Sequence, residues 1–253
     1  MEYSTISDCG LKRSMNEDYC HAQTIENNGA KTGFFIVADG MGGHNRGEIA
    51  SKTAVQEMKK YIEDHLKESN IDTGNIKLLI SRAFYEANNK VYSLAVSNKE
   101  YIGMGTTLIA SVIAEKEIII GNVGDSRAYI YSNGDLRQIT TDNSYVEELV
   151  SRGFINREQA KNHPKRNMIT RAIGTDETVK VDFYHEEISC GDYMLLCTDG
   201  LTNMVSDFEI KNILEKSSNT TDCCKQLVKR ANEKGGTDNI TAICIALSEN
   251  KKA

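Results

Sequence analysis

Apolar and polar residues follow one another along this chain with two different periods. Over residues 47–66, and again over 76–94, apolar residues return at every third or fourth position. This spacing places them on one face of an α-helix, so both segments are predicted to be amphipathic helices. The polar stretch between them is short, and the two helices are therefore expected to pack as antiparallel neighbours.

Short apolar runs with turn residues at their ends predict β-strands in much of the remaining chain. These runs cover residues 3–9, 17–25, 34–39, 106–114, 117–123, 127–131, 136–139, 179–188, 193–199 and 239–247. The sequence Asn133-Gly134-Asp135 predicts a hairpin turn between two of these strands. The last run is apolar almost throughout, which is typical of a strand that is buried on both faces.

Helix-start signals occur at further places, where a residue suited to capping is followed by Glu or Gln three positions later. These pairs are Ser144 with Glu147, Asn156 with Gln159, and Ser206 with Glu209. They predict two short helices within 145–162 and another helix after residue 206. One more helix is expected at 222–234.

Runs of strands interrupted by two blocks of paired helices favour an α+β fold with antiparallel sheets covered by helices, and disfavour βαβ winding. The chain has no internal repeat and no Pro-rich linker, since Pro164 is its only proline. We therefore expect a single domain over residues 1–253, in which residues 142–168 form a surface flap.

The composition narrows the class of protein and the kinds of partner. The 253 residues carry a net charge of −6, which disfavours nucleic acid or an anionic membrane as the main partner. No apolar run approaches the roughly 20 residues that a membrane-spanning helix needs, and the N-terminus lacks a signal-peptide core. The seven cysteines form no CxxC pair, so reduced thiols are expected. We infer a cytoplasmic protein without membrane insertion.

Four aspartates occupy similar positions, each at an end of a predicted strand and beside a small residue. They are Asp39, Asp125, Asp199 and Asp238. Each one alone is more often a turn residue or a helix cap than a ligand. As a group they favour a cation site, because gathered carboxylates repel one another unless cations neutralise them. Oxygen ligands without His or Cys point to Mg²⁺ or Mn²⁺ and away from zinc.

Several short motifs include these aspartates and follow one another from residue 10 to about 247. They are Arg13 with Asn16-Glu17-Asp18, Ala38-Asp39-Gly40-Met41-Gly42-Gly43-His44, Gly105-Thr106-Thr107, Val123-Gly124-Asp125-Ser126-Arg127, Thr170-Arg171-Ala172-Ile173-Gly174, Thr198-Asp199-Gly200-Leu201 and Gly236-Thr237-Asp238-Asn239-Ile240-Thr241. In this order they resemble the metal-dependent serine/threonine protein phosphatases of the 2C type (the PPM family), and its bacterial branch in particular. Any single motif is weak evidence, whereas the ordered set is highly specific.

The resemblance implies a four-layer α-β-β-α sandwich, in which two central antiparallel sheets are flanked by paired antiparallel helices. It also implies that Asp39 bridges two metal ions, Mn²⁺ or Mg²⁺, and that the backbone carbonyl of Gly40 binds one of them. Asp199 and Asp238 match the residues that complete the site of the other ion. Asp125, together with Asp199, matches the site of a third and weaker ion.

The same resemblance implies roles for residues around the metals. Glu17 and Asp18 match residues that orient metal-bound water, and Arg13 matches the arginine that grips the phosphate. A water shared by two divalent cations becomes hydroxide-like near neutral pH and attacks phosphorus in line, so that no phosphoenzyme forms. The expected function is therefore that of a protein serine/threonine phosphatase. Its expected partners are phosphorylated proteins, including a cognate Ser/Thr kinase, and the chain itself is expected to be monomeric.

Some polar residues in or near these motifs have no definite role. Certain relatives carry a His directly after Asp-Gly that suits protonation of the leaving group, but this position is Met41 here, so that role is unassigned. His44 is expected to fix local structure, and His163 matches a histidine near the site of bacterial relatives, where substrate handling is a candidate role. Arg127 and Arg171 are expected to brace the site and not to touch the substrate.

Two other classes of function compete with this prediction. The first is a catalytically inactive relative that binds phosphoproteins, but such relatives usually lose metal aspartates, and this chain keeps all four. The second is a two-metal nuclease or other phosphodiesterase, which the acidic charge and the lack of a basic, aromatic-rich patch oppose. Turnover assays with added Mn²⁺ and incubation with labelled DNA distinguish these classes.

Overall fold

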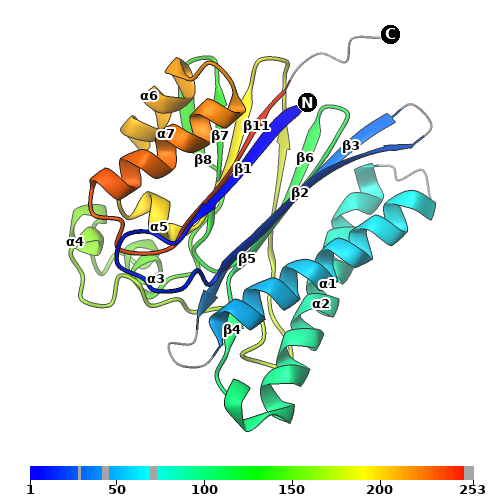
Figure 1. The fold of residues 1–253 in the computed structure, drawn as a ribbon, viewed down its shortest axis with the longest axis vertical. Coiled ribbons are helices and arrows are strands. Elements are labelled where there is room, and N and C mark those ends of the chain that lie inside the picture. The colour runs from blue at the N-terminus through cyan, green and yellow to red at the C-terminus, as the bar shows by residue number, and fades with distance from the viewer. Residues whose placement is uncertain (28–29, 42–45, 69–72, 248–253) are drawn as a thin grey trace.

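Two antiparallel β-sheets lie face to face in the centre of the molecule, and helices cover the outer face of each (Figure 1). The computed structural model describes residues 1–27, 30–41, 46–68 and 73–247. The chain crosses from one sheet to the other between strands β1 (Glu2–Asp8) and β2 (Asp18–Asn27). The short segment between these strands therefore lies where the two sheets meet.

The first sheet has the strand order β1-β11-β10-β7-β8. The bounds of the strands after β1 are Ile240–Ala246 for β11, Tyr193–Cys197 for β10, Arg127–Ser132 for β7 and Asp135–Gln138 for β8. Strand β11 pairs with β1 on one side and with β10 on the other, and its residues are almost all buried. This position confirms the prediction of a final strand that is covered on both faces.

The second sheet has the strand order β2-β3-β5-β6-β9. The bounds of the strands after β2 are Ala30–Met41 for β3, Leu108–Ala114 for β5, Glu117–Val123 for β6 and Asp182–Glu187 for β9. A two-residue strand, β4 (Gly105–Thr106), pairs with the end of β3 beside this sheet. The predicted antiparallel arrangement is confirmed for both sheets.

The helices separate into two groups. On the second sheet lie α1 (Gly47–Glu68) and α2 (Thr73–Ser97), which pack against each other as predicted and are followed by the 3₁₀ turn Lys99–Tyr101. On the first sheet lie α5 (Asp199–Thr202), α6 (Asp207–Lys216) and α7 (Thr220–Glu233). Two short helices, α3 (Tyr145–Ser151) and α4 (Arg157–Lys161), occupy the connection between β8 and β9.

Apolar side chains form three layers of core, which explains the four-layer stack. On β3, Phe34 and Ile36 face α1 and α2, whereas Phe35 and Val37 face the other sheet, as the period-two alternation of a strand requires. Between the first sheet and its helices, Leu227 of α7 belongs to the third apolar cluster. The predicted α+β sandwich with helices on both outer faces is confirmed.

Several strand bounds differ from the prediction. Two of these differences change where an aspartate lies in the secondary structure. Strand β3 continues through Asp39 to Met41, because Gly40 and Met41 pair with β4. Strand β10 ends at Cys197, and Asp199 is the first residue of helix α5 instead of a strand end. The predicted strand 106–114 is divided at Thr107, and only 182–187 of the predicted strand 179–188 is extended.

The predicted helix starts are confirmed by side-chain caps. Asn156 and Ser206 each form a reciprocal capping box with the residue three positions later. Ser144 accepts a hydrogen bond from the backbone N–H of Glu147. None of the described helices is long and apolar enough to cross a membrane. The interpretation of 1–253 as a single domain with a flap at 142–168 stays a prediction.

Candidate metal-dependent active site

Asp18 and Asp39 lie directly opposite each other on β2 and β3. One carboxylate oxygen of Asp18, Oδ2, accepts hydrogen bonds from the hydroxyls of Thr198 at 2.9 Å and Thr241 at 2.7 Å. The other oxygen, Oδ1, is buried and has no hydrogen-bond partner. A buried oxygen without a donor is energetically costly. It therefore marks a place that suits a cation or an ordered water molecule.

The backbone around Asp39 is tightly held. Its N–H donates to Oγ1 of Thr107 at 2.9 Å, and the hydroxyl of Thr106 donates to its carbonyl oxygen at 2.8 Å. At Gly40 a Cβ atom would lie 2.2 Å from the carbonyl oxygen of Gly47, so no side chain fits there. This close packing brings the start of α1 against the end of β3 and leaves backbone, not side chain, next to Asp39.

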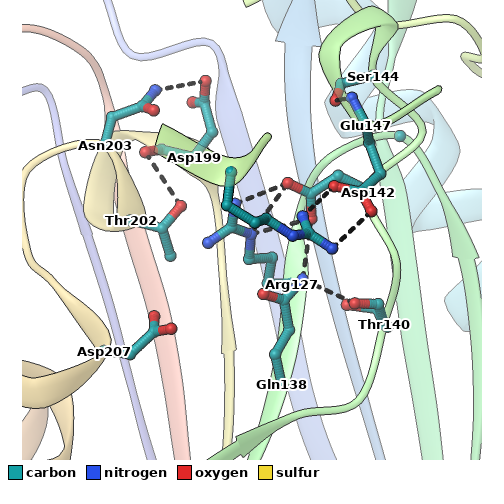
Figure 2. A network of polar contacts seen from close by, with 12 residues as sticks. Arg127, Gln138, Thr140, Asp142, Ser144, Glu147, Asp199, Thr202, Asn203 and Asp207 are labelled. Carbon is teal, nitrogen blue, oxygen red and sulfur yellow. Dashed lines mark hydrogen bonds and ion pairs between the residues drawn. The ribbon is translucent and has the colours of Figure 1, made fainter. Parts of the chain in front are cut away.

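Asp199 lies beside the first sheet, opposite Asp39, and Asp125 lies in the turn after strand β6. Asp199 begins α5 and accepts a hydrogen bond from the side chain of Asn203 at 2.9 Å (Figure 2). Asp125 follows β6 in a tight turn, where Gly124 has φ of +110° and packs against Thr107. Only glycine adopts this backbone conformation without strain. The turn therefore depends on Gly124 to place Asp125.

Asp238 precedes β11 and forms an ion pair with Arg13, whose Nη2 lies 2.8 Å from Oδ2 of Asp238. The other oxygen of Asp238 accepts the backbone N–H of Asn239 at 2.8 Å. Arg13 is the predicted phosphate-binding residue, and its side chain is 48% exposed. The structure thus brings together two predicted site residues that are 225 positions apart in the chain.

Asp18, Asp39, Asp125, Asp199 and Asp238, which we call the acid cluster, act on one another electrostatically. Burial raises the pKa of Asp39 well above its usual value, and the charges of the other four raise it further. Burial also raises the pKa of Asp18 to about 7, with a smaller contribution from the charge of Asp199. Carboxylates that repel one another in this way are stabilised by protons or by cations.

The pKa values of Asp125 and Asp199 are shifted in the same direction. Burial and the charge of Asp199 raise the pKa of Asp125. Burial and the charge of Asp238 raise the pKa of Asp199, although hydrogen bonds to Asp39 and from Asn203 oppose this shift. Two carboxyl groups that are hydrogen-bonded to each other must share a proton or a cation.

The donor set of the acid cluster fits a hard divalent cation. All of its side-chain ligands are carboxylate oxygens, and Asp39 and Asp199 keep partial exposure to solvent, which gives an ion access. Within residues 1–27, 30–41, 46–68 and 73–247, no three His, Cys, Asp or Glu side chains already have a geometry that would hold a metal ion. Asp238 and Asp199 instead point at Arg13 and Asn203.

Arg127 joins the acid cluster to the predicted flap. Its Nε and Nη2 donate to both carboxylate oxygens of Asp142, at distances between 2.7 and 3.1 Å (Figure 2). Its Nη1 donates to the hydroxyl of Tyr129. Arg171 similarly bonds Asp182 at 2.5 Å. Both arginines are thus bound to protein carboxylates, as expected for residues that brace the site.

The other predicted residues lie in simpler surroundings. Glu17 places its carboxylate beside Gly47, and burial raises its pKa. The ring of His163 packs near that of Tyr145, with centroids 5.8 Å apart, and its Nδ1 accepts the backbone N–H of Lys165. His44 lies outside the described residues. Substrate handling by His163 stays a prediction.

Four polar residues that hold the acid cluster were not predicted individually. Thr198 and Thr241 bind Asp18, Thr107 binds the backbone of Asp39, and Asn239 binds the segment that carries Arg13. All four belong to the short motifs identified in the sequence. Their position inside those motifs was the available signal, but hydroxyl and amide side chains do not reveal their partners.

The fold and the convergence of the five aspartates define a metal-dependent hydrolase of the α-β-β-α class. The chain belongs to the protein phosphatase 2C family, whose sequence model matches residues 11–242. The resemblance seen in the motifs is thereby confirmed.

Relatives named as serine/threonine phosphatases match over nearly the whole chain. A serine/threonine phosphatase, stp, of Listeria innocua is 38% identical over 241 residues, which are 94% of this chain and 93% of that protein. The crystal structure of the serine/threonine phosphatase Stp1 from Staphylococcus aureus is 37% identical, with a TM-score of 0.89 and coverage of 98% of this chain and 95% of that one. The catalytic domain of the phosphatase PstP, solved with two manganese ions, is 31% identical, with a TM-score of 0.84 and 98% coverage of both chains.

Proposed function

We propose that this chain is a metal-dependent phosphatase that removes phosphate from phosphoserine and phosphothreonine in proteins. The observation that carries this proposal is the acid cluster, in which five aspartates from distant segments gather at one edge of the sheet sandwich. Family membership and the names of the relatives support the same activity. A catalytically inactive relative is disfavoured because each predicted metal aspartate is present and close to the others.

We propose that Asp39 and the carbonyl of Gly40, together with Asp199 and Asp238, hold two Mn²⁺ or Mg²⁺ ions. The related PstP catalytic domain was solved with two manganese ions. Asp125 and Asp199 are the proposed ligands of a third, weaker ion. Bound cations of this kind supply a nucleophile from water near neutral pH and neutralise charge on the phosphoryl oxygens.

The chain's own residues prepare the site for this chemistry. The Oδ1 atom of Asp18, which is buried without a donor, is suited to accept a hydrogen bond from the attacking water. Glu17, whose carboxylate lies beside Gly47, is proposed to assist in orienting that water. Thr106 and Thr107 hold the backbone of Asp39, so the position from which its carboxylate extends is set before the reaction begins.

Arg13 has a second use in this proposal. In the structure its guanidinium pairs with Asp238, but nearly half of its side chain is exposed. A phosphate group offers the same pattern of paired oxygens as a carboxylate, with more charge. When Asp238 turns toward a cation, Arg13 is released to donate its N–H groups to the phosphoryl oxygens. The thioether of Met41 cannot donate a proton, so the alkoxide leaving group takes its proton elsewhere.

The finer features of this function are also proposals. Phosphoproteins are the proposed substrate class, and a Ser/Thr kinase that acts on the same proteins is the proposed functional counterpart. The seven cysteines are all free, which agrees with the predicted cytoplasmic location. Monomeric behaviour is expected and is tested by light scattering of the purified chain.

Phosphate release from a phosphothreonine peptide tests the proposed function. We expect turnover with about 1 mM Mn²⁺, a concentration in the range of weak hard-ion sites, and no turnover after chelation by EDTA. A phosphotyrosine peptide of the same sequence and labelled DNA serve as controls for the substrate class. Absence of turnover on every phosphopeptide with Mn²⁺ present, or cleavage of the DNA, would contradict the proposal.

A further inference from the structure

The segment between β1 and β2 carries Arg13 at its middle and Glu17 at its end. Residues 9–17 of this segment have no regular secondary structure, and the Arg13 side chain is about half exposed. A charged side chain on such a segment is useful for binding only if the backbone below it is fixed. The hydrogen bonds of the segment show which residue fixes it.

Asn239 bonds both ends of this segment with a single side chain. Its Nδ2 donates to the carbonyl oxygens of Cys9 and Met15, both at 3.0 Å, and its Oδ1 accepts the backbone N–H of Glu17 at 2.8 Å. Asn239 is 4% exposed, so these bonds are shielded from water. All three partners lie on the 9–17 segment: Cys9 four positions before Arg13, Met15 two positions after it and Glu17 four positions after it.

Asn239 is also adjacent in sequence to Asp238, the ion-pair partner of Arg13. Its backbone N–H donates to Oδ1 of Asp238 at 2.8 Å. The same residue therefore sets the position of the Arg13 backbone by its side chain and the orientation of Asp238 by its main chain. Other contacts each hold one point of the segment. The N–H of Leu11 donates to the carbonyl of Gly236 at 2.8 Å, and the carbonyl of Glu17 accepts from Gly40 N–H at 3.1 Å and from the Ser51 hydroxyl at 2.6 Å.

We propose that Asn239 is a positioning residue that sets the affinity of the site for the phosphoryl group by fixing the 9–17 segment under Arg13. This inference rests on the proposed function, because it assigns Arg13 to the phosphoryl group. Asn239 acts through Arg13 and does not itself touch substrate. Loss of its side chain leaves two carbonyl groups and one N–H without partners, so the segment samples other conformations and Arg13 meets the phosphate less often.

Asn88 provides a matched control for a purely structural effect. Like Asn239 it is buried, at 2% exposed, and it donates to two carbonyl oxygens, those of Asp176 and Glu177, both at 3.1 Å. It also accepts one backbone N–H, that of Gly174, at 2.9 Å. The two asparagines thus make the same three kinds of bond, but Asn88 lies on α2 and bonds a segment other than 9–17.

The experiment compares Asn239→Ala, Asn88→Ala and the wild type on a phosphothreonine peptide at saturating Mn²⁺. For Asn239→Ala we expect KM to rise about tenfold while kcat changes less than about threefold. The inhibition constant of inorganic phosphate should rise by a similar factor. Asn88→Ala should lose comparable thermal stability but keep KM within about twofold of the wild type.

A double-mutant cycle tests whether the effect passes through Arg13. If it does, Asn239→Ala in an Arg13→Ala background should change KM by less than about twofold. The proposal is overturned if Asn239→Ala raises KM as much without Arg13 as with it, or if Asn88→Ala raises KM equally. A weaker affinity for Mn²⁺ in calorimetry, with KM unchanged at saturating metal, would also overturn it.

Hydrogen exchange gives a readout that does not depend on activity. Amides of residues 10–17 should exchange at least about tenfold faster in Asn239→Ala than in the wild type or in Asn88→Ala. This faster exchange is expected even if the wild type proves inactive on phosphopeptides. Failure of the proposed function is therefore distinguished from failure of the inference about Asn239. If Asn239→Ala does not fold, Asn239→Asp replaces it. This variant keeps the acceptor for the N–H of Glu17 and loses both donors. Unchanged amide exchange and unchanged KM in Asn239→Asp would overturn the proposal.

Discussion

Two groups of carboxylates in this protein have opposite surroundings. In the acid cluster, burial and the neighbouring acids raise the pKa of Asp39 and of Asp199. On the outer face of α6 and α7, Glu209 accepts hydrogen bonds from Arg230 and Lys234 at 2.7 and 2.6 Å, and these bonds lower its pKa. The same chemical group is therefore destabilised as an anion in one region and stabilised in the other.

The contrast teaches which region serves the fold and which serves function. Glu209 has cationic partners from its own chain, and the capping box that it forms with Ser206 starts α6. In the acid cluster, Arg13 pairs with Asp238 on the exposed rim, and the charge of Arg127 only partly opposes the raised pKa of Asp125 and Asp199. A protein that keeps repelling carboxylates together gives up stability for a purpose, and binding of divalent cations is the purpose that the oxygen ligands fit.

The surroundings of a third carboxylate, that of Asp142, combine features of both regions. Asp142 is nearly buried, with its side chain 14% exposed, but Arg127 meets it with paired N–H groups. It touches the edge of the acid cluster, since its charge contributes to the raised pKa of Asp125. Here the chain supplies its own cation, whereas the acid cluster requires one from solution.

Removing one member of the acid cluster should have the largest effect. Asp39→Asn should lower kcat/KM for a phosphothreonine peptide by at least about 1,000-fold at saturating Mn²⁺, because the variant loses the proposed shared ligand of the two ions. Circular dichroism should show an unchanged fold, and the melting temperature without metal should be equal or higher, because a repelling charge is gone. The exposed Asp64→Asn on α1 is the control, and activity of Asp39→Asn within tenfold of it would contradict the assignment.

Breaking the Arg127–Asp142 pair should destabilise the fold. Arg127→Gln leaves the Asp142 carboxylate without its main partner and should lower the free energy of unfolding by about 3 kcal/mol, measured by urea denaturation at pH 7. The matched control is Arg137→Gln, since Arg137 also pairs with a carboxylate, that of Glu186, at 2.8 Å but is 54% exposed. That variant should lose less than about 1 kcal/mol. Equal losses of unfolding free energy in the two variants would contradict the expectation that burial of an ion pair determines the cost of breaking it.

Addition of metal should stabilise the acid cluster and leave the Glu209 region unaffected. Mn²⁺ at 100 times its dissociation constant should raise the free energy of unfolding by about 2.7 kcal/mol, as linkage requires for an ion that binds only the folded state. Differential scanning fluorimetry measures this shift, and EDTA should reverse it. Asp238→Asn should reduce the shift, whereas Glu209→Gln should preserve it. An equal shift in Asp238→Asn would remove Asp238 from the ligand set.

The smallest effect is expected at Glu209, where solvent screens the ion pairs. Because its folded-state pKa is lowered, Glu209 contributes stability above its unfolded-state pKa of about 4.3, and this contribution is lost as pH falls toward the folded value. Glu209→Gln should therefore be less stable than the wild type by less than about 1 kcal/mol at pH 7, and the difference should shrink below about pH 4. A difference that grows on acidification, in urea unfolding from pH 7 to 3, would contradict this sign.

Local patterns were sufficient to predict most of the secondary structure. The helical spacing of apolar residues predicted α1 and α2, and the side-chain caps at Asn156 and Ser206 predicted the starts of α4 and α6. Strand β6 has the predicted bounds. These features depend on residues within a few positions of one another, where side-chain spacing and cap chemistry act directly.

Strand and helix bounds near the site were less predictable. Asp39 lies inside β3 because β4, more than 60 residues later, pairs with Gly40 and Met41. Asp199 lies in α5, where a strand was predicted to end. The glycines after both aspartates indicate a turn, but a strand can continue through glycine when a partner strand is present.

The sequence by itself determined the family, because ordered motifs identify a family even when each motif is weak, and through the family it indicated which acids to propose for the chemistry. Only the tertiary structure decided that Arg13 pairs with Asp238, that Arg127 binds Asp142, and that Asn239 bonds both ends of the 9–17 segment. The physical reason is that a hydrogen bond needs two groups within about 3 Å, and the partners here come from distant parts of the chain. Such a match depends on how the sheets stack, and residue type and spacing alone do not specify it.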